Sequence, residues 1–183
     1  MATYLITLSD IQTLKPISTN VNEAKALKPF ILEAQEFDLR PFLGDAFYLA
    51  LLDDFNASPS LSTYSDLFNG VTYTYNSDTY QHDGLKAMLI YYAYARYLNN
   101  SQSTVTPNGV VSKLNDNSEK ISDRALSRLV NQATSGAKVY ENRVYDYLVR
   151  NDSSYPLWEC YKRNKRTGGF RLGSIGGKKW AIN

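Results

Sequence analysis

The sequence predicts a mainly α protein: a helical bundle with one or two small β-hairpins and an extended C-terminal arm. Apolar residues recur every three or four positions over residues 24–34, 84–99 and 121–150, which is the spacing of a buried helix face. Residues 71–81 instead alternate between apolar and polar side chains, as the strands of a hairpin do. Residues 165–183 hold five glycines and no acidic residue, a composition that cannot build a core.

Length and composition restrict the class of protein. The chain has 183 residues, of which 43% are hydrophobic and 21% charged, so we expect one globular domain. A single cysteine, Cys160, excludes a disulfide framework, and a single histidine, His82, excludes sites with two histidine ligands. The first residues do not resemble a signal peptide, and no apolar run is long enough to cross a bilayer. We therefore expect no metal, no cofactor and no membrane segment.

The charges are distributed unevenly along the chain. Twenty basic and 18 acidic residues leave a net charge of +2. All the acidic residues precede Tyr161, and seven basic residues follow it. The first 160 residues therefore hold 13 basic and 18 acidic residues, a balance of −5, and the end of the chain carries +7. Such a basic tail on an acidic body predicts a negatively charged partner for the tail.

Residues 1–19 contain Pro16 and only weak periodicity, so we expect an extended N-terminal arm with a short strand at 4–8. The helical bundle domain is predicted over residues 20–164. Asn20, followed by Glu23, has the spacing of a capping box at the start of the first helix. Pro29 lies inside this helix and should kink or split it, because proline lacks the N–H donor.

A second buried helix is predicted from Pro41 or Gly44 to residue 55, with an extended residue at Arg40 before the proline. A loop at 56–62 and a helical turn at 64–69 follow, and Gly70 ends that turn. The hairpin at 71–81 is expected to project from the bundle.

The strongest helical patterns lie in the second half of the chain. Residues 84–99 are apolar on several faces and predict the central helix. Residues 101–120 are polar around a Pro-Asn-Gly turn and predict a second projecting hairpin or long loop. A long helix is expected over 121–150, capped by Ser122 or Asp123, and a short one over 156–164.

The predicted functional residues belong to the C-terminal docking arm, residues 165–183, and the residues just before it. Its apolar side chains are spaced singly among glycines, which is typical of a segment that binds a partner in an extended form. Aromatic anchors would fill pockets, and arginines would pair with carboxylates or carbonyl groups. The predicted partner-binding residues are Arg163, Arg166, Phe170, Arg171, Leu172, Ile175, Lys178 and Trp180.

No catalytic constellation is evident, so we expect a protein that is not an enzyme. Cys160 is interpreted as a packing residue, and His82 as a surface or turn residue at the hairpin edge. The adjacent Asp53 and Asp54 diverge by about 100° on a helix, which indicates a solvated helix end. Residues 176–179 (GGKK) lack the other residues of a phosphate-binding loop.

Residues 27–52, which include the corner DLRPFLG at 38–44, resemble the opening helices of head-to-tail connector proteins of tailed bacteriophages. These proteins are also called portal adaptors or head-completion proteins. Residues 84–98, the projecting loop, the long helix and the basic terminal arm are similar in order. The resemblance is strongest to the neck proteins of crAss-like, podovirus-type phages.

The resemblance implies a helical bundle repeated as a homo-oligomeric ring, usually a dodecamer of twelve subunits, on the portal vertex of the virion. The ring would prolong the DNA channel, through which DNA passes transiently, and would present a platform to a downstream neck or tail protein. It would be assembled in the host cytoplasm. By resemblance, residues 165–183 would reach the portal protein, and a chain of this length extends roughly 60 Å.

Two other functions remain open from the sequence. The first is a nucleic-acid-binding module, in which the basic tail follows phosphates while Tyr161, Phe170 and Trp180 stack on bases. Binding that weakens steeply with salt would favour this function. The second is an enzyme whose site combines scattered carboxylates and tyrosines, although no residue is indicated as its nucleophile.

Overall fold

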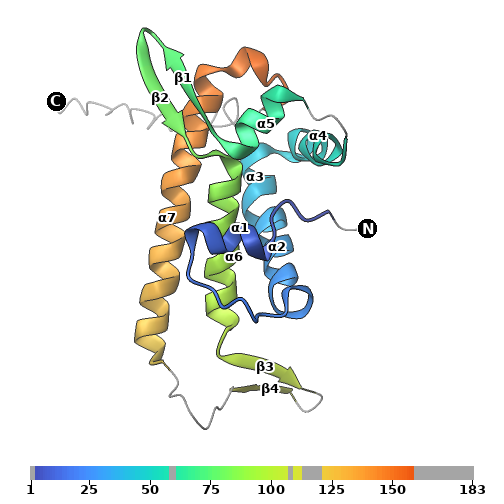
Figure 1. Cartoon of the computed structure of the whole chain (residues 1–183), viewed down its shortest axis with the longest axis vertical. Helices are drawn as coiled ribbons and strands as arrows, with labels where there is room; N and C mark the ends of the chain where they lie inside the picture. Colours follow the sequence, from blue (N-terminus) through green and yellow to red (C-terminus); the bar gives the residue numbers. More distant parts are fainter. Residues whose placement is uncertain (1–2, 58–60, 107–108, 113–120, 159–183) are drawn as a thin grey trace, which may run out of the picture.

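The computed structural model describes residues 3–57, 61–106, 109–112 and 121–158 and confirms a mainly α fold (Figure 1). In chain order the elements are α1 (Leu8–Leu14), the π-helical turn η1 (Glu23–Leu27), α2 (Lys28–Ala34), the π-helical turn η2 (Gln35–Leu39), α3 (Arg40–Leu43), α4 (Asp45–Asn56), α5 (Ser62–Asn69), β1 (Val71–Tyr75), β2 (Asp78–His82), α6 (Gly84–Asn100), β3 (Ser103–Thr106), β4 (Gly109–Ser112), α7 (Asp123–Arg150) and the 3-10 turn η3 (Asp152–Ser154).

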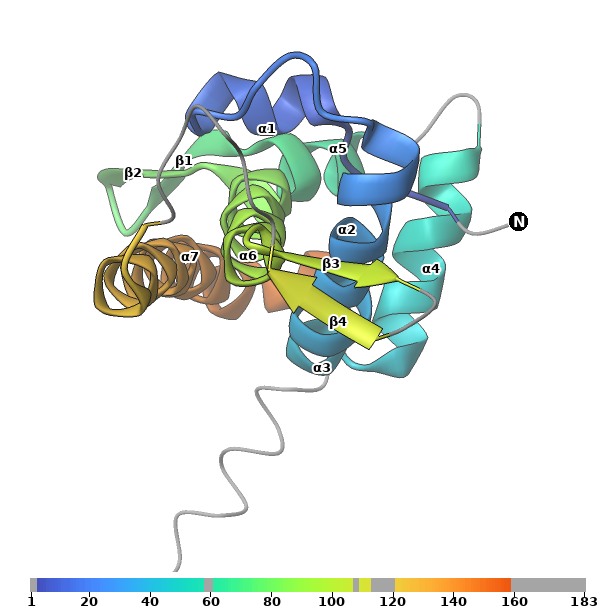
Figure 2. The same cartoon turned by 90° about the horizontal axis from the view of Figure 1, so that it is seen from below.

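Helix α6 lies at the centre of the molecule, as its apolar composition predicts. Helix α7 runs along one side of α6, the column of α2, η2 and α3 lies on the other, and α4 is outermost beyond that column (Figure 2). Helix α1 crosses the front, and the two hairpins lie at opposite ends of the molecule (Figure 1). The fully buried residues Leu85, Met88, Leu89 and Ala93 of α6 therefore face neighbours on several sides.

The N-terminal segment is part of the core. Leu5 and Ile6 are buried. The side chain of Gln35, which is also buried, pairs with this segment: its Oε1 accepts a hydrogen bond from the Leu5 N–H at 2.9 Å, and its Nε2 donates to the Thr3 carbonyl at 3.0 Å. A buried amide with both ends satisfied fixes the position of the segment, because unmaking either bond would leave a polar group unpaired.

The predicted strand at 4–8 is therefore wrong, and residues 8–14 of the expected extended arm form α1 instead. Thr7 caps this helix and forms a capping box with Asp10. The Thr-x-x-Asp spacing is the sequence signal of this cap. The cap predicted at Asn20 is also wrong. Asn22 holds that position, since its side chain accepts the Lys25 N–H at 3.1 Å.

Two prolines are accommodated by widened helical turns. Pro29 and Pro41 each stand two residues after the end of a π-helical turn, η1 and η2, in the first turn of the helix that follows. Proline has no N–H to donate, and the shifted hydrogen-bond register of these turns accommodates that missing bond. The chain is therefore split before Pro29, as predicted, but Arg40 is helical (φ −60°, ψ −45°) and not extended as expected. The bend comes at Gly44, between α3 and α4.

The hairpin at residues 71–81 is confirmed as β1 and β2, paired antiparallel from Val71 with His82 to Tyr75 with Asp78. Gly70 and Gly84 enclose it, both with positive φ, and a Cβ atom on either would collide with the backbone of the crossing segment. Two backbones can approach this closely only without side chains. The second hairpin is confirmed in part, as β3 and β4, while residues 107–108 and 113–120 lie outside the described residues.

The long helix predicted over 121–150 is confirmed as α7, with Ser122 as its N-cap accepting the Ala125 N–H at 3.3 Å. Past η3, Pro156 and Leu157 form a turn. The rest of the helix predicted over 156–164 lies outside the described residues, apart from Trp158. None of the helices in the described ranges combines the length and apolar character that crossing a membrane requires.

Candidate functional site

The partner-binding residues predicted from the sequence lie outside the described residues. The same holds for Cys160. The described part of the chain ends at Trp158. The predicted residues concerned are Arg163, Arg166, Phe170, Arg171, Leu172, Ile175, Lys178 and Trp180.

The end of the described chain is held firmly against the bundle. The Tyr155 hydroxyl lies 2.8 Å from the Thr63 carbonyl, to which it donates, and 3.1 Å from the Tyr147 hydroxyl. Burial raises the pKa of Tyr155 well above its usual range, and the hydrogen bond with Tyr147 adds to the rise. Trp158 is buried against the ring of Tyr145, with ring centroids 5.4 Å apart. The basic segment therefore continues from a fixed point on the body.

His82 is buried, so the surface interpretation is wrong. Its ring stacks on Tyr147, with centroids 4.1 Å apart, and its Nδ1 accepts the Gly84 N–H at 3.2 Å. Burial lowers the pKa of His82, and the nearby Asp83 and Asp66 only partly oppose this. A neutral ring with Nδ1 as acceptor carries its proton on Nε2, which has no partner among the described residues. His82 therefore serves packing between the hairpin and α7.

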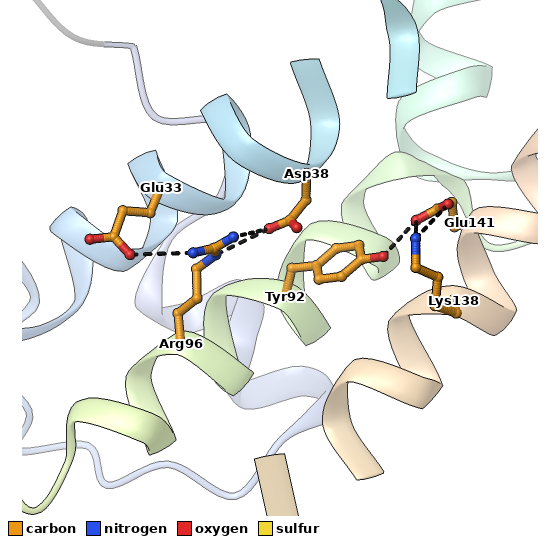
Figure 3. A network of polar contacts seen from close by, with 6 residues as sticks. All are labelled: Glu33, Asp38, Tyr92, Arg96, Lys138 and Glu141. Atoms are coloured by element: carbon orange, nitrogen blue, oxygen red, sulfur yellow. Dashed lines mark hydrogen bonds and ion pairs between the residues drawn. The ribbon is translucent and has the colours of Figure 1, made fainter. Parts of the chain in front are cut away.

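An ion-pair network ties the helices together on one side of α6 (Figure 3). Arg96 of α6 reaches Asp38 of η2 through Nη2 at 2.9 Å and Nε at 3.1 Å, and Glu33 of α2 at 3.5 Å. Burial raises the pKa of Asp38 despite the hydrogen bond from Arg96. The exposed ring of Phe37 lies 5.3 Å from the Arg96 guanidinium. This half of the network fastens the column of α2 and η2 to α6.

The other half of the network fastens α6 to α7. The Tyr92 hydroxyl donates to Glu141 Oε2 at 2.5 Å, and Lys138 contacts both Glu141 oxygens at 2.8 and 2.9 Å. Burial and the bond to Glu141 raise the pKa of Tyr92 to about 12. Each carboxylate of this network thus lies next to a cation or accepts a hydrogen bond, so the network holds the helices together structurally. A cavity of about 240 Å³ lies beside it, lined mainly by α6 and α7.

A long acidic stretch is the chemical feature that our reading of the sequence missed. Residues 41–85 contain six aspartates and neither lysine nor arginine, and they form α4, α5 and the first hairpin. Asp45 pairs with Arg40, and Asp83 with Arg143. The other aspartates of the stretch form no ion pair within the described ranges; they are Asp53, Asp54, Asp66 and Asp78.

A groove of about 350 Å³ opens on this acidic side, between the N-terminal segment, α4 and α5. Leu51 and Phe68 are among its apolar lining residues. Its charged lining residues are Asp54 and the ion pair of Asp10 with Lys86, so the lining carries one net negative charge. Phe55, which lines it, is 42% exposed, and the nearby Leu61 is 60% exposed. The Asp54 Oδ1 accepts the Leu61 N–H at 2.7 Å, so the carboxylate is fixed at the groove. We refer to this feature as the α4–α5 groove.

A larger cleft of about 550 Å³ lies between α1, the first hairpin and α6. Its lining mixes neutral polar residues such as Thr13 and Gln81 with apolar residues and with the charged Asp83 and Lys86. Within the described ranges, no three histidine, cysteine, aspartate or glutamate side chains cluster in a way that could hold a metal ion. Among these three cavities, the α4–α5 groove is the one in which an aspartate with no ion pair in the described ranges, Asp54, lies beside an exposed apolar ring, Phe55.

Comparison with known proteins places the chain in a family. A family model described as a family of unknown function, DUF6712, matches residues 39–168. No curated protein and no solved structure matches the chain. The matched region begins at the end of η2, includes α4, both hairpins and α7, and ends ten residues past Trp158. Because it covers more than half of the sequence, the chain belongs to the DUF6712 family.

Proposed function

We propose that the protein is a structural virion component: a ring-forming connector between the portal vertex of a phage capsid and its neck or tail proteins. It would prolong the DNA channel without catalysing a reaction. The resemblance of residues 27–52 and 84–98 to phage connectors suggests this role. The fold is compatible with it, since those residues form the bent column from α2 to α4 and the central α6.

The observation that carries the proposal is the placement of exposed apolar residues on opposite flanks of a rigid body. Leu49 on α4 is 53% exposed, and Val139 on α7 is 51% exposed. Helices α4 and α7 lie on opposite sides of α6 (Figure 2). A closed ring joins one surface of each subunit to a different surface of the next, and the two flanks supply such a pair of surfaces.

The basic segment supports attachment to a second protein. Residues 165–183 begin seven positions after Trp158, which with Tyr155 anchors the end of the described chain. In a ring, many copies of one weak contact act together, so modest affinity at each arm gives firm attachment.

Deleting residues 165–183 tests this function. The core of described residues should keep its helical content by far-ultraviolet circular dichroism, and binding to the portal protein should be lost in pull-down assays. A variant in which a glycine-serine stretch of equal length replaces the segment controls for chain length. Undiminished portal binding by either variant would contradict the proposed role of the arm.

The basic, aromatic tail also favours a second candidate, binding to nucleic acid. Counterion release makes such binding fall steeply with salt, whereas an arm held by apolar anchors depends less on salt. Measuring the particle mass at two salt concentrations, alone, with portal protein and with duplex DNA, separates the two. A particle that gains mass only with DNA, and only at low salt, would favour the second candidate.

A further inference from the structure

We propose that the α4–α5 groove binds residues 165–175 of a neighbouring copy of the chain. The inference rests on the proposed ring and names the contact that would hold adjacent subunits together. It assigns the first part of the arm to the ring and leaves residues 176–183, with Lys178 and Trp180, for the portal protein.

Charge complementarity is strong and has a clear location. The stretch from 41 to 85 carries six aspartates with no basic residue, while the chain beyond Tyr161 carries seven basic residues with no acidic one. Asp53 and Asp54, which form no ion pair within the described ranges, follow one another near the end of α4, and Asp54 lines the groove. Arg166 and Arg171 of the arm offer the planar donors that bind carboxylates best.

The spacing of the arm fits the groove. In an extended segment alternate side chains point the same way, so Phe170 and Leu172 share one side while Arg171 points to the other. The two apolar side chains would then lie about 7 Å apart. They can contact Phe55, which is exposed in the groove, and the edges of the nearly buried Leu51 and Phe68, while Arg171 lies toward Asp54.

The reach of the arm allows docking on a neighbouring copy, and the proposed ring places such a copy beside each subunit. The groove is lined by Tyr4, Thr7 and Asp10, in and before α1, whereas Trp158 packs on Tyr145 of α7. The end of the described chain also contacts α5, where the Tyr155 hydroxyl donates to the Thr63 carbonyl, so the test must distinguish docking on the same chain from docking on a neighbour. The seven to 17 residues that link Trp158 to positions 165–175 extend roughly 25 to 60 Å, which is enough to cross to an adjacent subunit.

Photo-crosslinking with the full chain tests the contact directly. A photoreactive p-benzoylphenylalanine replaces Phe170, and equal amounts of normal and heavy-isotope-labelled protein are mixed before assembly. We expect mass spectrometry to find crosslinks from position 170 to residues 45–69 in which about half join a normal to a heavy peptide. A probe at position 180 serves as the control and should not reach those residues.

A charge variant gives a second readout. Asp53→Asn with Asp54→Asn should raise the concentration for half-assembly about tenfold, measured by mass photometry. Asparagine still accepts the Leu61 N–H, so the loop after α4 is retained. The matched control, Asp146→Asn with Asp152→Asn, removes the same charge from α7 and η3 and should leave assembly unchanged.

The outcomes separate this inference from the proposed function. Crosslinks found only between two normal or two heavy peptides would mean that the arm docks on its own chain, and this would overturn docking on a neighbour. Crosslinks from position 170 to residues outside 45–69 would overturn the groove as the site, even if the chain binds portal normally. Equal loss of assembly in both charge variants would also overturn it. Loss of portal binding without loss of the crosslinks to residues 45–69 would instead leave the groove assignment intact.

Discussion

Gly136 lies in the middle of α7, where a Cβ atom would overlap the ring of Tyr91 on α6. From the sequence this glycine is only a local cost to the helix of about 1 kcal/mol. The structure shows its use, since the Tyr91 ring occupies the space that a side chain at Gly136 would fill and lies 5.0 Å from the Tyr140 ring, tilted by 60° to it. Lys15 completes the group, with its ammonium 3.5 Å from the centre of the Tyr91 ring. A single missing side chain thus brings two helices together.

His82 gives a prediction at the same scale. Burial lowers its pKa in the folded protein below the ordinary value of 6.5. When the pH falls below about 6.5, the unfolded chain binds a proton that the folded chain resists, so the free energy of unfolding decreases until the lower folded pKa is reached. Urea unfolding between about pH 7.5 and pH 5.5 should show this loss of stability.

His82→Asn is the control, because its side-chain oxygen can still accept the Gly84 N–H but does not titrate. The variant should be less stable at each pH, through lost stacking on Tyr147, yet nearly independent of pH over the same range. Since the chain has one histidine, an unchanged pH dependence in the variant would assign the effect to other groups.

At the scale of elements, the first hairpin contains a strained turn. Asn76 and Ser77 form its two-residue loop, both with positive φ, 52° and 72°. Such a turn matches the twist of a hairpin, but the second position strongly prefers glycine. Asparagine tolerates this backbone and serine does so poorly. The alternating pattern of residues 71–81 therefore specifies the hairpin without the glycine that the second loop position usually holds.

Ser77→Gly should accordingly raise the thermal midpoint, by relief of about 0.5–1 kcal/mol of backbone strain after the entropy of the added glycine is counted. The same change at Ser127, an exposed position in α7, should lower the midpoint, because glycine costs a helix several tenths of a kcal/mol. Differential scanning calorimetry measures both. A fall in both variants would show that the turn is not strained.

At the scale of the molecule, the division of charge is the main feature. The acidic α4–α5 side and the basic end of the chain belong to one polypeptide, so copies of it can attract one another in a head-to-tail sense. Electrostatic attraction of this kind speeds encounter and sets orientation, while apolar anchors provide most of the affinity.

Substitutions at Trp180 and Lys178 separate the apolar contribution to portal binding from the electrostatic one. Trp180→Ala should weaken binding of the assembled ring to portal protein by about 2 kcal/mol or more per arm, as loss of an aromatic anchor does. Lys178→Ala should cost about 1 kcal/mol or less, as loss of an exposed charge does. Calorimetric titration compares them. Equal losses would mean that charge alone holds the arm.

The sequence by itself determined the elements with long periodic patterns, α6, α7 and the hairpins, because their hydrogen bonds and spacing are local. It also determined the separation of acidic body from basic end. Only the tertiary structure decided that residues 3–14 enter the core through Gln35, that His82 is buried on Tyr147, and that an acidic groove forms between α4 and α5. Those contacts join residues dozens of positions apart, and a local pattern carries no information about which distant side chains will meet.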